Sequence, residues 1–446
     1  MSETAIIILA AGKGSRMKSG LPKVLHQIAG KSMLGHVLSA AKKLNPKLLV
    51  LVLGPNMEKV GAAMAVEAPE IEIVVQEERL GTGHAVLMAK KSLKGFEGNV
   101  LILYGDVPLI MHSTLNSLLT NLSENTEIAV LAFERNDNAD YGRLEVNSDG
   151  VVDKIVEAHE INSKNNISNL CNSGIMAVRS KHIFDLLEVI TNNNTKGEYY
   201  LTDIVKHARS NNMRCMYSTA TENEVMGIND RIQLSKAEKL MQQRLRNMAM
   251  VNGVTLIDPE STWLSADTVF GVDVIVGPNT VFGPGVVLED NVEIRAFCHL
   301  EGALVRRASI VGPYARLRPG SEIGESAHIG NFVEIKQTRV EEGAKINHLS
   351  YIGDARVGAG SNIGAGTITC NYDGYVKSLT DIGVNSFIGS NSALVAPVKI
   401  GDGAVVAAGS VITDNVASDS IAVARGTQTE RSGAAARRRD RKKKKG

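Results

Sequence analysis

The chain has 446 residues, with 49 lysines and arginines against 48 aspartates and glutamates and a formal net charge of +1. Its apolar runs are too short to span a bilayer, and no basic stretch precedes the first of them as in a secretory signal peptide. The four cysteines, at positions 171, 215, 298 and 370, form no CxxC pair. We therefore expect two or three domains and reduced thiols in a cytoplasmic protein without a membrane span.

Residues 1–229 alternate short apolar runs with amphipathic stretches. The pattern predicts helices over residues 33–44 and 83–90, and strands over residues 5–9, 48–53, 71–76, 100–104 and 128–133. This alternation is typical of a Rossmann-like α/β domain with a mostly parallel sheet. Ligands bind such domains beyond the carboxyl ends of the strands.

A glycine-rich turn follows the first predicted strand. The sequence LAAGKGSRM begins at Leu9 and contains Gly12, Gly14 and Arg16, and LPK follows and ends at Lys23. Glycines let backbone N–H groups approach phosphate oxygens, and the cations can neutralise charge when a phosphoanhydride breaks. The spacing matches neither GxxxxGK[ST] nor GxGxxG. It resembles the LxxGxGxRxxxxxPK signature of sugar-1-phosphate nucleotidylyltransferases.

Further polar residues follow the ends of predicted strands. Asp106 comes after strand 100–104, where a carboxylate can hold Mg²⁺ against nucleotide phosphates, and Asn229 can supply a second oxygen. Gln76, with the turn at Gly81 and Thr82, suits the edge of a pyrimidine. Taken singly, each of these residues is also common as a helix cap or a turn residue.

The composition changes at residue 230 and again at residue 251. Residues 230–250 lack glycine and proline and predict a helical linker. Over residues 251–426 aliphatic residues recur every six positions, at 311, 317, 323, 329 and 335 and again at 382, 388, 394, 400, 406 and 412. This period predicts a left-handed parallel β-helix with aliphatic side chains stacked inside. The register breaks between Thr369 and Asp381, which predicts a loop expelled from the coils.

His348 lies within this repeat but off its aliphatic rows. Arg318 and Lys336 from preceding coils, with Lys377 from the expelled loop, suit a phosphate group. A histidine beside them suits removal of a proton from an amine before acyl transfer. The alternative is a zinc site formed by three histidines, namely His299, His328 and His348.

Residues 427–446 form a basic tail. From Glu430 onward it carries nine cationic and two acidic residues, a net charge of +7, which leaves about −6 on the rest of the chain. Such tails can contact nucleic acid or anionic lipid. Because no aromatic or apolar side chains larger than alanine interleave the charges, we expect a solvated, disordered segment and no nucleic-acid partner.

Both halves together resemble the bacterial bifunctional N-acetylglucosamine-1-phosphate uridylyltransferase/glucosamine-1-phosphate N-acetyltransferase family, over about residues 6–425. The resemblance rests on seven motifs, which begin at Leu9 (LAAG), Gly81 (GTGH), Tyr104 (YGD), Gly197 (GEYY), Arg316 (RLRPG), Asn331 (NFVE) and Asn362 (NIGAGT). It implies a homotrimer that acetylates glucosamine-1-phosphate with acetyl-CoA. UMP is then transferred from UTP to N-acetylglucosamine-1-phosphate, with Mg²⁺ and release of pyrophosphate.

The resemblance also implies site residues. His348 would be the general base of acetyl transfer, Arg16 and Lys23 would stabilise the phosphates of UTP, and Asp106 and Asn229 would ligate Mg²⁺. The UTP and UDP-sugar site would comprise Leu9, Ala10, Ala11, Gly12, Lys23, Gln76, Gly81, Thr82, Tyr104, Gly105, Asp106, Gly142, Glu157, Asn172 and Asn229. Glucosamine-1-phosphate would contact Arg318, Lys336, Tyr351, Asn362 and Lys377. Acetyl-CoA would contact Ala365, Asn371, Tyr372, Ser390, Ala408 and Arg425.

Narrower interpretations stay open. One is a single-activity sugar-1-phosphate nucleotidylyltransferase whose β-helix is structural, and another is an acetyltransferase whose first half only binds nucleotide. A trimeric scaffold without activity would explain the hexads but not the two polar loops.

Overall fold

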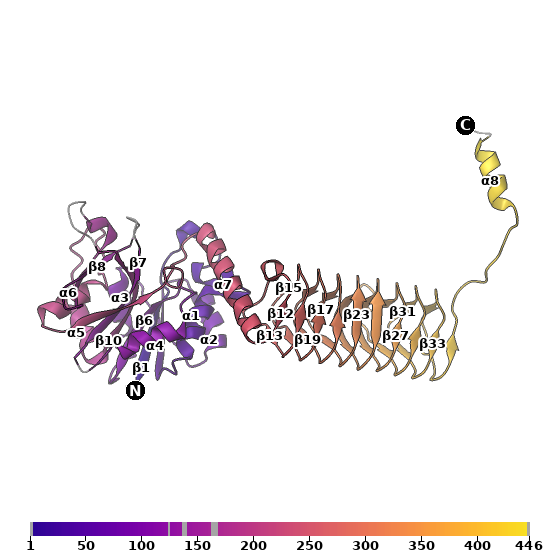
Figure 1. Cartoon of the computed structure of the whole chain (residues 1–446), viewed down its shortest axis with the longest axis horizontal. Coiled ribbons are helices and arrows are strands. Elements are labelled where there is room, and N and C mark those ends of the chain that lie inside the picture. The colour runs from indigo at the N-terminus through magenta and orange to yellow at the C-terminus, as the bar shows by residue number, and fades with distance from the viewer. Residues whose placement is uncertain (1–2, 124, 136–140, 162–167, 444–446) are drawn as a thin grey trace. The chain divides into compact units, whose positions relative to one another are not determined.

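The computed structural model describes residues 3–123, 125–135, 141–161 and 168–443 (Figure 1). It divides into two compact units, residues 1–244 and residues 245–446. In the described ranges, no helix is both long enough and apolar enough to cross a membrane.

The first unit is built on a nine-stranded mixed sheet with the strand order β11-β7-β10-β6-β1-β4-β5, to which β8 and β9 are attached through β10. The neighbours β6, β1, β4 and β5 are parallel, whereas β10 runs antiparallel to β6 and β7. A separate hairpin joins β2 and β3. The strands are β1 (Thr4–Leu9), β2 (Gln27–Ile28), β3 (Lys31–Ser32), β4 (Leu48–Leu53), β5 (Glu72–Val75), β6 (Asn99–Tyr104), β7 (Ile128–Glu134), β8 (Arg143–Val146), β9 (Val152–Val156), β10 (Leu170–Arg179) and β11 (Cys215–Ala220).

Helices cover both faces of this sheet because side chains of a strand alternate between its faces. Ile6 and Ile8 of β1 pack with α1, α2 and α4, while Ile7 and Leu9 pack with α3, α5 and α6. These helices are α1 (Met33–Lys42), α2 (Glu58–Glu67), α3 (Thr82–Leu87), α4 (His112–Thr120), α5 (Ser180–Glu188) and α6 (Asp203–Ser210). Short 3-10 helices occur at Ser15–Met17, Lys23–Leu25, Met88–Lys90 and Ala158–Glu160.

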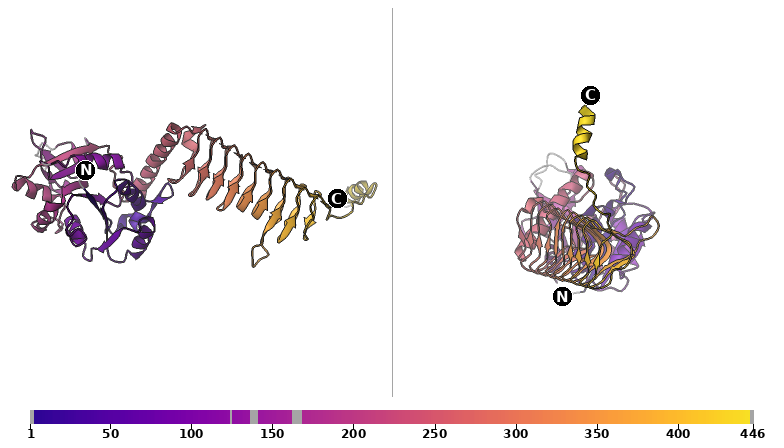
Figure 2. Two further views of the ribbon diagram at one scale, coloured as in Figure 1. Left: turned by 90° about the horizontal axis from the view of Figure 1, so that it is seen from below. Right: turned by 90° about the vertical axis from the view of Figure 1, so that its right-hand side faces the viewer.

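The second unit is a stack of short parallel strands in three rows, whose coils follow one another in Figure 2. Row 1 is a ten-stranded sheet: β12 (Thr255–Leu256), β14 (Ile275–Val276), β17 (Glu293–Ile294), β20 (Ile310–Val311), β23 (His328–Asn331), β25 (Lys345–His348), β27 (Asn362–Ile363), β30 (Phe387–Ile388), β33 (Val405–Val406) and β35 (Ile421–Ala422). The other two rows share a fourteen-stranded sheet.

Rows 2 and 3 are joined because β24 (Glu334–Val340) and β26 (Tyr351–Val357) each run through both. Row 2 also holds β13 (Val269–Phe270), β16 (Val287–Leu288), β19 (Ala303–Val305), β22 (Ser321–Ile323), β29 (Thr380–Ile382) and β32 (Val398–Ile400). Row 3 also holds β15 (Val281–Phe282), β18 (His299–Leu300), β21 (Arg316–Leu317), β28 (Ile368–Cys370), β31 (Ala393–Val395) and β34 (Val411–Ile412). A 3-10 turn at Pro259–Ser261 precedes these rows.

The aliphatic hexad positions form the interior of this second unit. All eleven predicted positions, from Val311 to Ile412, are buried and belong to one hydrophobic cluster. The β-helix prediction is therefore confirmed. Between β28 and β29 the chain leaves the coils in a loop closed by a bridge between Tyr372 and Lys377, where Tyr375 is 92% exposed (Figure 2).

Two helices lie outside these layers. Helix α7 (Arg231–Val251) follows the first unit's sheet, close to the predicted linker helix. Helix α8 (Ala434–Lys443) lies in the basic tail, where the sequence predicts disorder. Its run of alanine and arginine has high helix propensity. Because no residue of this helix is buried, local propensity and not packing accounts for the departure from the predicted disorder.

Candidate active sites

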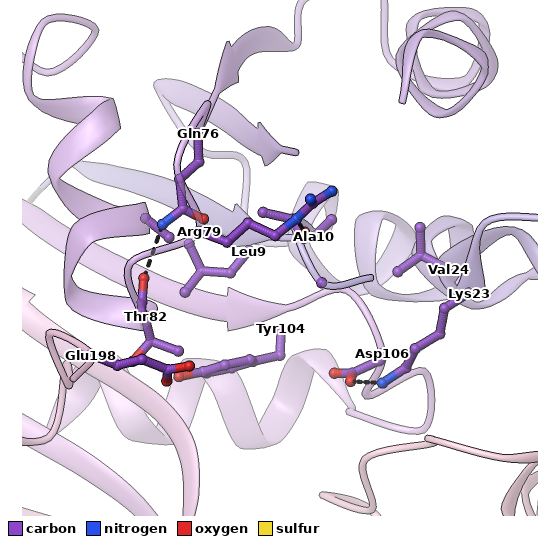
Figure 3. A pocket seen from close by; sticks show the side chains of 14 residues that line it. Leu9, Ala10, Lys23, Val24, Gln76, Arg79, Thr82, Tyr104, Asp106 and Glu198 are labelled. Carbon is purple, nitrogen blue, oxygen red and sulfur yellow. Dashed lines mark hydrogen bonds and ion pairs between the residues drawn. The ribbon is translucent and has the colours of Figure 1, made fainter. Parts of the chain in front are cut away.

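A cavity of about 300 Å³ opens at the carboxyl ends of β1 and β6. Most of the described residues that line it come from the glycine-rich turn, the segment after β5 and the end of β6 (Figure 3). The 3-10 helix Lys23–Leu25 and the segment between α5 and α6 supply the others. Most of the lining residues were predicted for the UTP site: Leu9, Ala10, Ala11, Gly12, Lys23, Gln76, Gly81, Thr82, Tyr104 and Asp106. The remaining lining residues are Val24, Arg79, Ala85 and Glu198.

The Lys23 ammonium group lies between two oxygen atoms at one end of this cavity. Its Nζ is 2.5 Å from Oδ2 of Asp106 and 2.7 Å from Oδ1 of Asn229. A backbone hydrogen bond of 2.9 Å from Ile228 N–H to the Asp106 carbonyl ties the two segments together. These two oxygens thus already hold a positive charge, and their chemistry fits Mg²⁺, which commonly takes one or two protein oxygens plus substrate phosphates.

Tyr104 and Thr82 form a second polar pair in the cavity. Burial raises the pKa of the Tyr104 phenol, and the charge of Glu157 raises it further. The phenol therefore stays protonated at neutral pH and can donate a hydrogen bond. Glu157 itself accepts a hydrogen bond of 2.7 Å from the hydroxyl of Thr202.

Several predicted residues are not among the described residues that line the cavity. Arg16 is exposed on the 3-10 helix Ser15–Met17. Asn172 of β10 donates its N–H to the carbonyl of Gly142 at 2.8 Å, which places these two residues together where β8 begins. Gly105 is held by a 2.9 Å bond from its N–H to the Leu9 carbonyl, which joins the ends of β6 and β1.

Arg79 was not predicted from the sequence. Its Nε donates to the Ala11 carbonyl at 2.6 Å, so it ties the segment after β5 to the glycine-rich turn. Glu198 was missed as well, although it lies in the GEYY motif, which was the available signal.

Gly81 provides a test of the geometry at this cavity. Its φ is +113°, and an added Cβ would lie 2.6 Å from the Tyr199 carbonyl oxygen and 2.8 Å from the Tyr199 nitrogen. With the role in UTP binding that the resemblance implies, we expect Gly81→Ala to raise the KM for UTP about ten-fold or more, because a Cβ at this φ would strain and shift the turn. Steady-state kinetics of pyrophosphate release measure this. The matched control is Gly20→Ala, since a Cβ at Gly20 has open space; an unchanged KM in Gly81→Ala would contradict the expectation.

In the second unit, His348 stands at the end of β25, where row 1 turns toward row 3. Its Nδ1 is 2.7 Å from Oδ1 of Asn331, its neighbour on the preceding coil. With that amide oxygen as acceptor, Nδ1 carries a hydrogen, so the neutral imidazole has its lone pair on Nε2. This is the form a general base needs. Asn331 lies in the NFVE motif but was assigned no role from the sequence.

Three of the predicted cations, Arg318, Lys336 and Lys377, gather on the adjacent coils and the expelled loop. Arg318 pairs with Glu334 at 2.9 Å, and Lys336 pairs with Asp354 at 3.6 Å. Lys377 of the loop faces Lys336, and a hydrogen bond between the two side chains, followed by the positive charge of Lys336, lowers the pKa of the Lys377 amine. A dianionic phosphate would relieve this repulsion.

The other predicted residues of this half lie on the same and the following coils and in the expelled loop. Asn371 donates to Asp354 and, at 3.5 Å, to the Tyr351 hydroxyl. Asn362 begins β27 on the coil after His348. The acetyl-CoA candidates continue toward the carboxyl end: Ala365 accepts from Asn391 N–H, Ser390 from Gly409 N–H, and Ala408 from the Arg425 guanidinium at 2.6 Å. Tyr372, 58% exposed, lies in the loop.

The zinc alternative has no support in this arrangement. Across the described residues, no group of three histidine, cysteine, aspartate or glutamate side chains is placed to hold a metal ion. The three histidines instead occupy different strands, at His299 of β18, His328 of β23 and His348 of β25.

Comparison with known proteins extends these observations. Residues 6–198 match the model of a MobA-like NTP transferase domain, and residues 380–414 match the hexapeptide repeat of succinyl-transferase. A protein of Paramagnetospirillum magneticum named bifunctional protein GlmU is 53% identical over 98% of this chain and 96% of its own length. The chain belongs to the GlmU family.

Further GlmU proteins give the same result. The one from Zymomonas mobilis is 48% identical over 98% of both chains, and the one from Ruegeria sp. is 50% identical over 97% of this chain and 96% of its own. The matched span includes the cavity of the first unit. It also includes the corner between rows 1 and 3 at His348, called the His348 corner below. The family prediction from the sequence is therefore confirmed.

Proposed function

We propose that this protein is a bifunctional enzyme of UDP-N-acetylglucosamine synthesis. It acetylates glucosamine-1-phosphate with acetyl-CoA and then transfers UMP from UTP to N-acetylglucosamine-1-phosphate, releasing pyrophosphate. The observation that carries the proposal is the 53% identity to a bifunctional GlmU protein over 98% of this chain, a span that includes both sites. Two assays on one preparation test it: pyrophosphate release from UTP with N-acetylglucosamine-1-phosphate, and free thiol release from acetyl-CoA with glucosamine-1-phosphate. If the folded protein released only pyrophosphate or only free thiol, a single-activity enzyme would be favoured.

Uridylyl transfer takes place in the cavity of the first unit. The phosphate oxygen of N-acetylglucosamine-1-phosphate attacks the α-phosphorus of UTP in line, and the bond to the leaving pyrophosphate breaks. Backbone N–H groups of the glycine-rich turn bind the phosphates, while Lys23 and Arg16 neutralise the charge on the leaving group. Asp106 and Asn229 would hold Mg²⁺, which when bound neutralises phosphate charge. The fit of this pair to a cation is supported by the ammonium group that they already hold.

Acetyl transfer takes place at the His348 corner. Nε2 of His348 removes a proton from the glucosamine amine as its nitrogen attacks the thioester carbonyl of acetyl-CoA. The tetrahedral intermediate then expels the coenzyme A thiolate, with the backbone N–H of Ala365 as a donor to the oxyanion. Arg318, Lys336 and Lys377 bind the sugar phosphate, and Asn331 holds the imidazole in the tautomer that the reaction needs.

We assign the uridylyltransferase to residues 1–229, a helical linker to residues 230–250, the acetyltransferase to residues 251–426 and a tail to residues 427–446. Two compact units that divide at residue 244, inside helix α7, support this division. Four free cysteines, three of them buried, support a reducing and hence cytoplasmic environment.

We further propose a homotrimer through the β-helix. One corner between rows 1 and 3 carries an exposed apolar ladder on successive coils, formed by Phe297, Tyr314, Phe332 and Leu349, each between 46% and 63% exposed. The rings of Phe297 and Tyr314 stack at 4.8 Å, and those of Tyr314 and Phe332 at 5.1 Å. The ladder ends at Leu349, next to His348, so a second copy seated on it would also cover the acetyl site. Uncovered apolar stretches of this kind mark interaction surfaces.

A charge in this ladder is expected to dissociate the assembly. Tyr314→Glu places an unpaired carboxylate among apolar side chains that the proposal buries between copies. Size-exclusion chromatography with light scattering is expected to give a trimer for the unmodified protein and a monomer for the variant. The control is Val269→Glu, since Val269 is 52% exposed but lies in row 2, opposite the ladder's corner. A trimer in Tyr314→Glu would place the interface elsewhere.

A further inference from the structure

Gln76 presents a fixed amide group to the cavity of the first unit. It follows β5 directly, is only 3% exposed and lines the cavity. Its Nε2 lies 3.0 Å from the carbonyl oxygen of Gly81 and 3.0 Å from Nδ1 of His84. Figure 3 shows the amide nitrogen turned toward the segment that precedes α3.

These two contacts determine which way the amide faces. A backbone carbonyl only accepts hydrogen bonds, so the atom of Gln76 that contacts Gly81 has to be the nitrogen. The second hydrogen of that nitrogen points to Nδ1 of His84, which therefore accepts, and the imidazole is neutral with its proton on Nε2. Both amide hydrogens are used within the protein. The amide oxygen is the group of Gln76 that is left to meet a ligand.

We propose that His84 is a positioning residue that sets the base specificity of uridylyl transfer. Together with the Gly81 carbonyl, it holds the Gln76 oxygen toward the base, so that the site takes a pyrimidine whose N3 carries a hydrogen. The inference rests on the proposed function, because it requires the nucleotide base to lie at Gln76. His84 is not among the described residues that line the cavity, and it therefore acts through Gln76 rather than on the base.

The chemistry of the two common pyrimidines explains the selection. Uracil has an N–H at N3, which donates to the Gln76 oxygen, whereas cytosine has a lone pair there, which faces a second acceptor. A buried acceptor opposed by another acceptor is costly, and sites built on such groups discriminate strongly. If the His84 acceptor is lost, one amide hydrogen has no partner, and the amide is free to turn and offer its nitrogen to cytosine.

Two variants of His84 test the role of its ring nitrogen. His84→Leu removes the acceptor, and His84→Asn keeps an acceptor two bonds from Cβ, where Nδ1 stands. We expect the ratio of kcat/KM for UTP to that for CTP to fall by about ten-fold or more in His84→Leu and to stay near the wild-type value in His84→Asn. A purely structural role predicts that both variants change turnover of UTP and CTP in parallel. An unchanged ratio in His84→Leu, or an equal fall in both variants, would overturn the proposal.

A chemical probe on the unmodified protein keeps the test decisive if His84→Leu fails to fold, which a thermal melt would show. 3-Methyluridine triphosphate lacks the N3 hydrogen, and 5-methyluridine triphosphate retains it. We expect the first to be rejected about as strongly as CTP and the second to be accepted. Equal use of both analogues would overturn the orientation of Gln76. Absence of any turnover with UTP itself would instead contradict the proposed function, so the two failures are distinguishable.

Discussion

Replacement of Asp106 by alanine is expected to reduce uridylyl transfer by about a thousand-fold while acetyl transfer is unchanged. The carboxylate holds the Lys23 ammonium group at 2.5 Å and is one of the two oxygens that fit Mg²⁺. In the proposed mechanism, its removal takes away a ligand of Mg²⁺ and also releases Lys23 from its place beside the phosphates. Pyrophosphate release from UTP measures the loss, and thiol release from acetyl-CoA measures the second activity in the same sample.

Two controls sharpen this experiment. Asp106→Asn keeps the shape of the side chain and one oxygen, so we expect a smaller loss that added Mg²⁺ partly restores. Val66→Ala changes a residue that is 82% exposed on α2 and is expected to leave both activities intact. If the folded Asp106→Ala protein lost acetyl transfer as well, the assignment of two separate sites would be wrong.

Replacement of His348 by alanine is expected to have the opposite pattern. A positioned general base contributes between about 10² and 10⁴-fold, so acetyl transfer should fall by this factor while pyrophosphate release is unchanged. Direct measurement of glucosamine-1-phosphate binding separates the base from the phosphate ligands, because Arg318 and Lys336 remain. Undiminished acetyl transfer in this variant would exclude His348 as the base.

Asn331→Ala is the companion variant. Without the amide oxygen 2.7 Å from Nδ1, the imidazole is no longer held in the tautomer with its lone pair on Nε2. We expect kcat of acetyl transfer to fall by about ten-fold with little change in KM, since the variant leaves the phosphate ligands in place. An effect confined to KM would mean that Asn331 contacts the substrate instead.

The sequence predicts the architecture well where the signal is local. Each predicted strand in the first unit is present within about two residues, and the hexad positions from Val311 to Ile412 are buried as expected. Both signals depend on the spacing of apolar residues along the chain. Strand β10 (Leu170–Arg179) was missed because Asn172, Ser173 and Gly174 have the composition of a turn. The structure accommodates them in a register shift between Asn172 and Met176.

The candidate sites were predictable to a lesser extent. Motifs such as LAAG and GTGH indicate which backbone segments meet a nucleotide, and the cavity includes most of them. Arg79 gave no such signal, because the target of a long side chain depends on where another segment, here at Ala11, lies in space. The contacts of Asn331 with His348 and of His84 with Gln76 likewise depend on residues brought together only by folding.

Three cations of the candidate sites are paired with carboxylates of the chain itself: Lys23 with Asp106, Arg318 with Glu334 and Lys336 with Asp354. A phosphate that binds to one of these three cations, as proposed, would take the place of an internal carboxylate. Added electrolyte screens the pair that is given up as well as the pair that forms. At these three cations we therefore expect substrate affinity to depend only weakly on ionic strength.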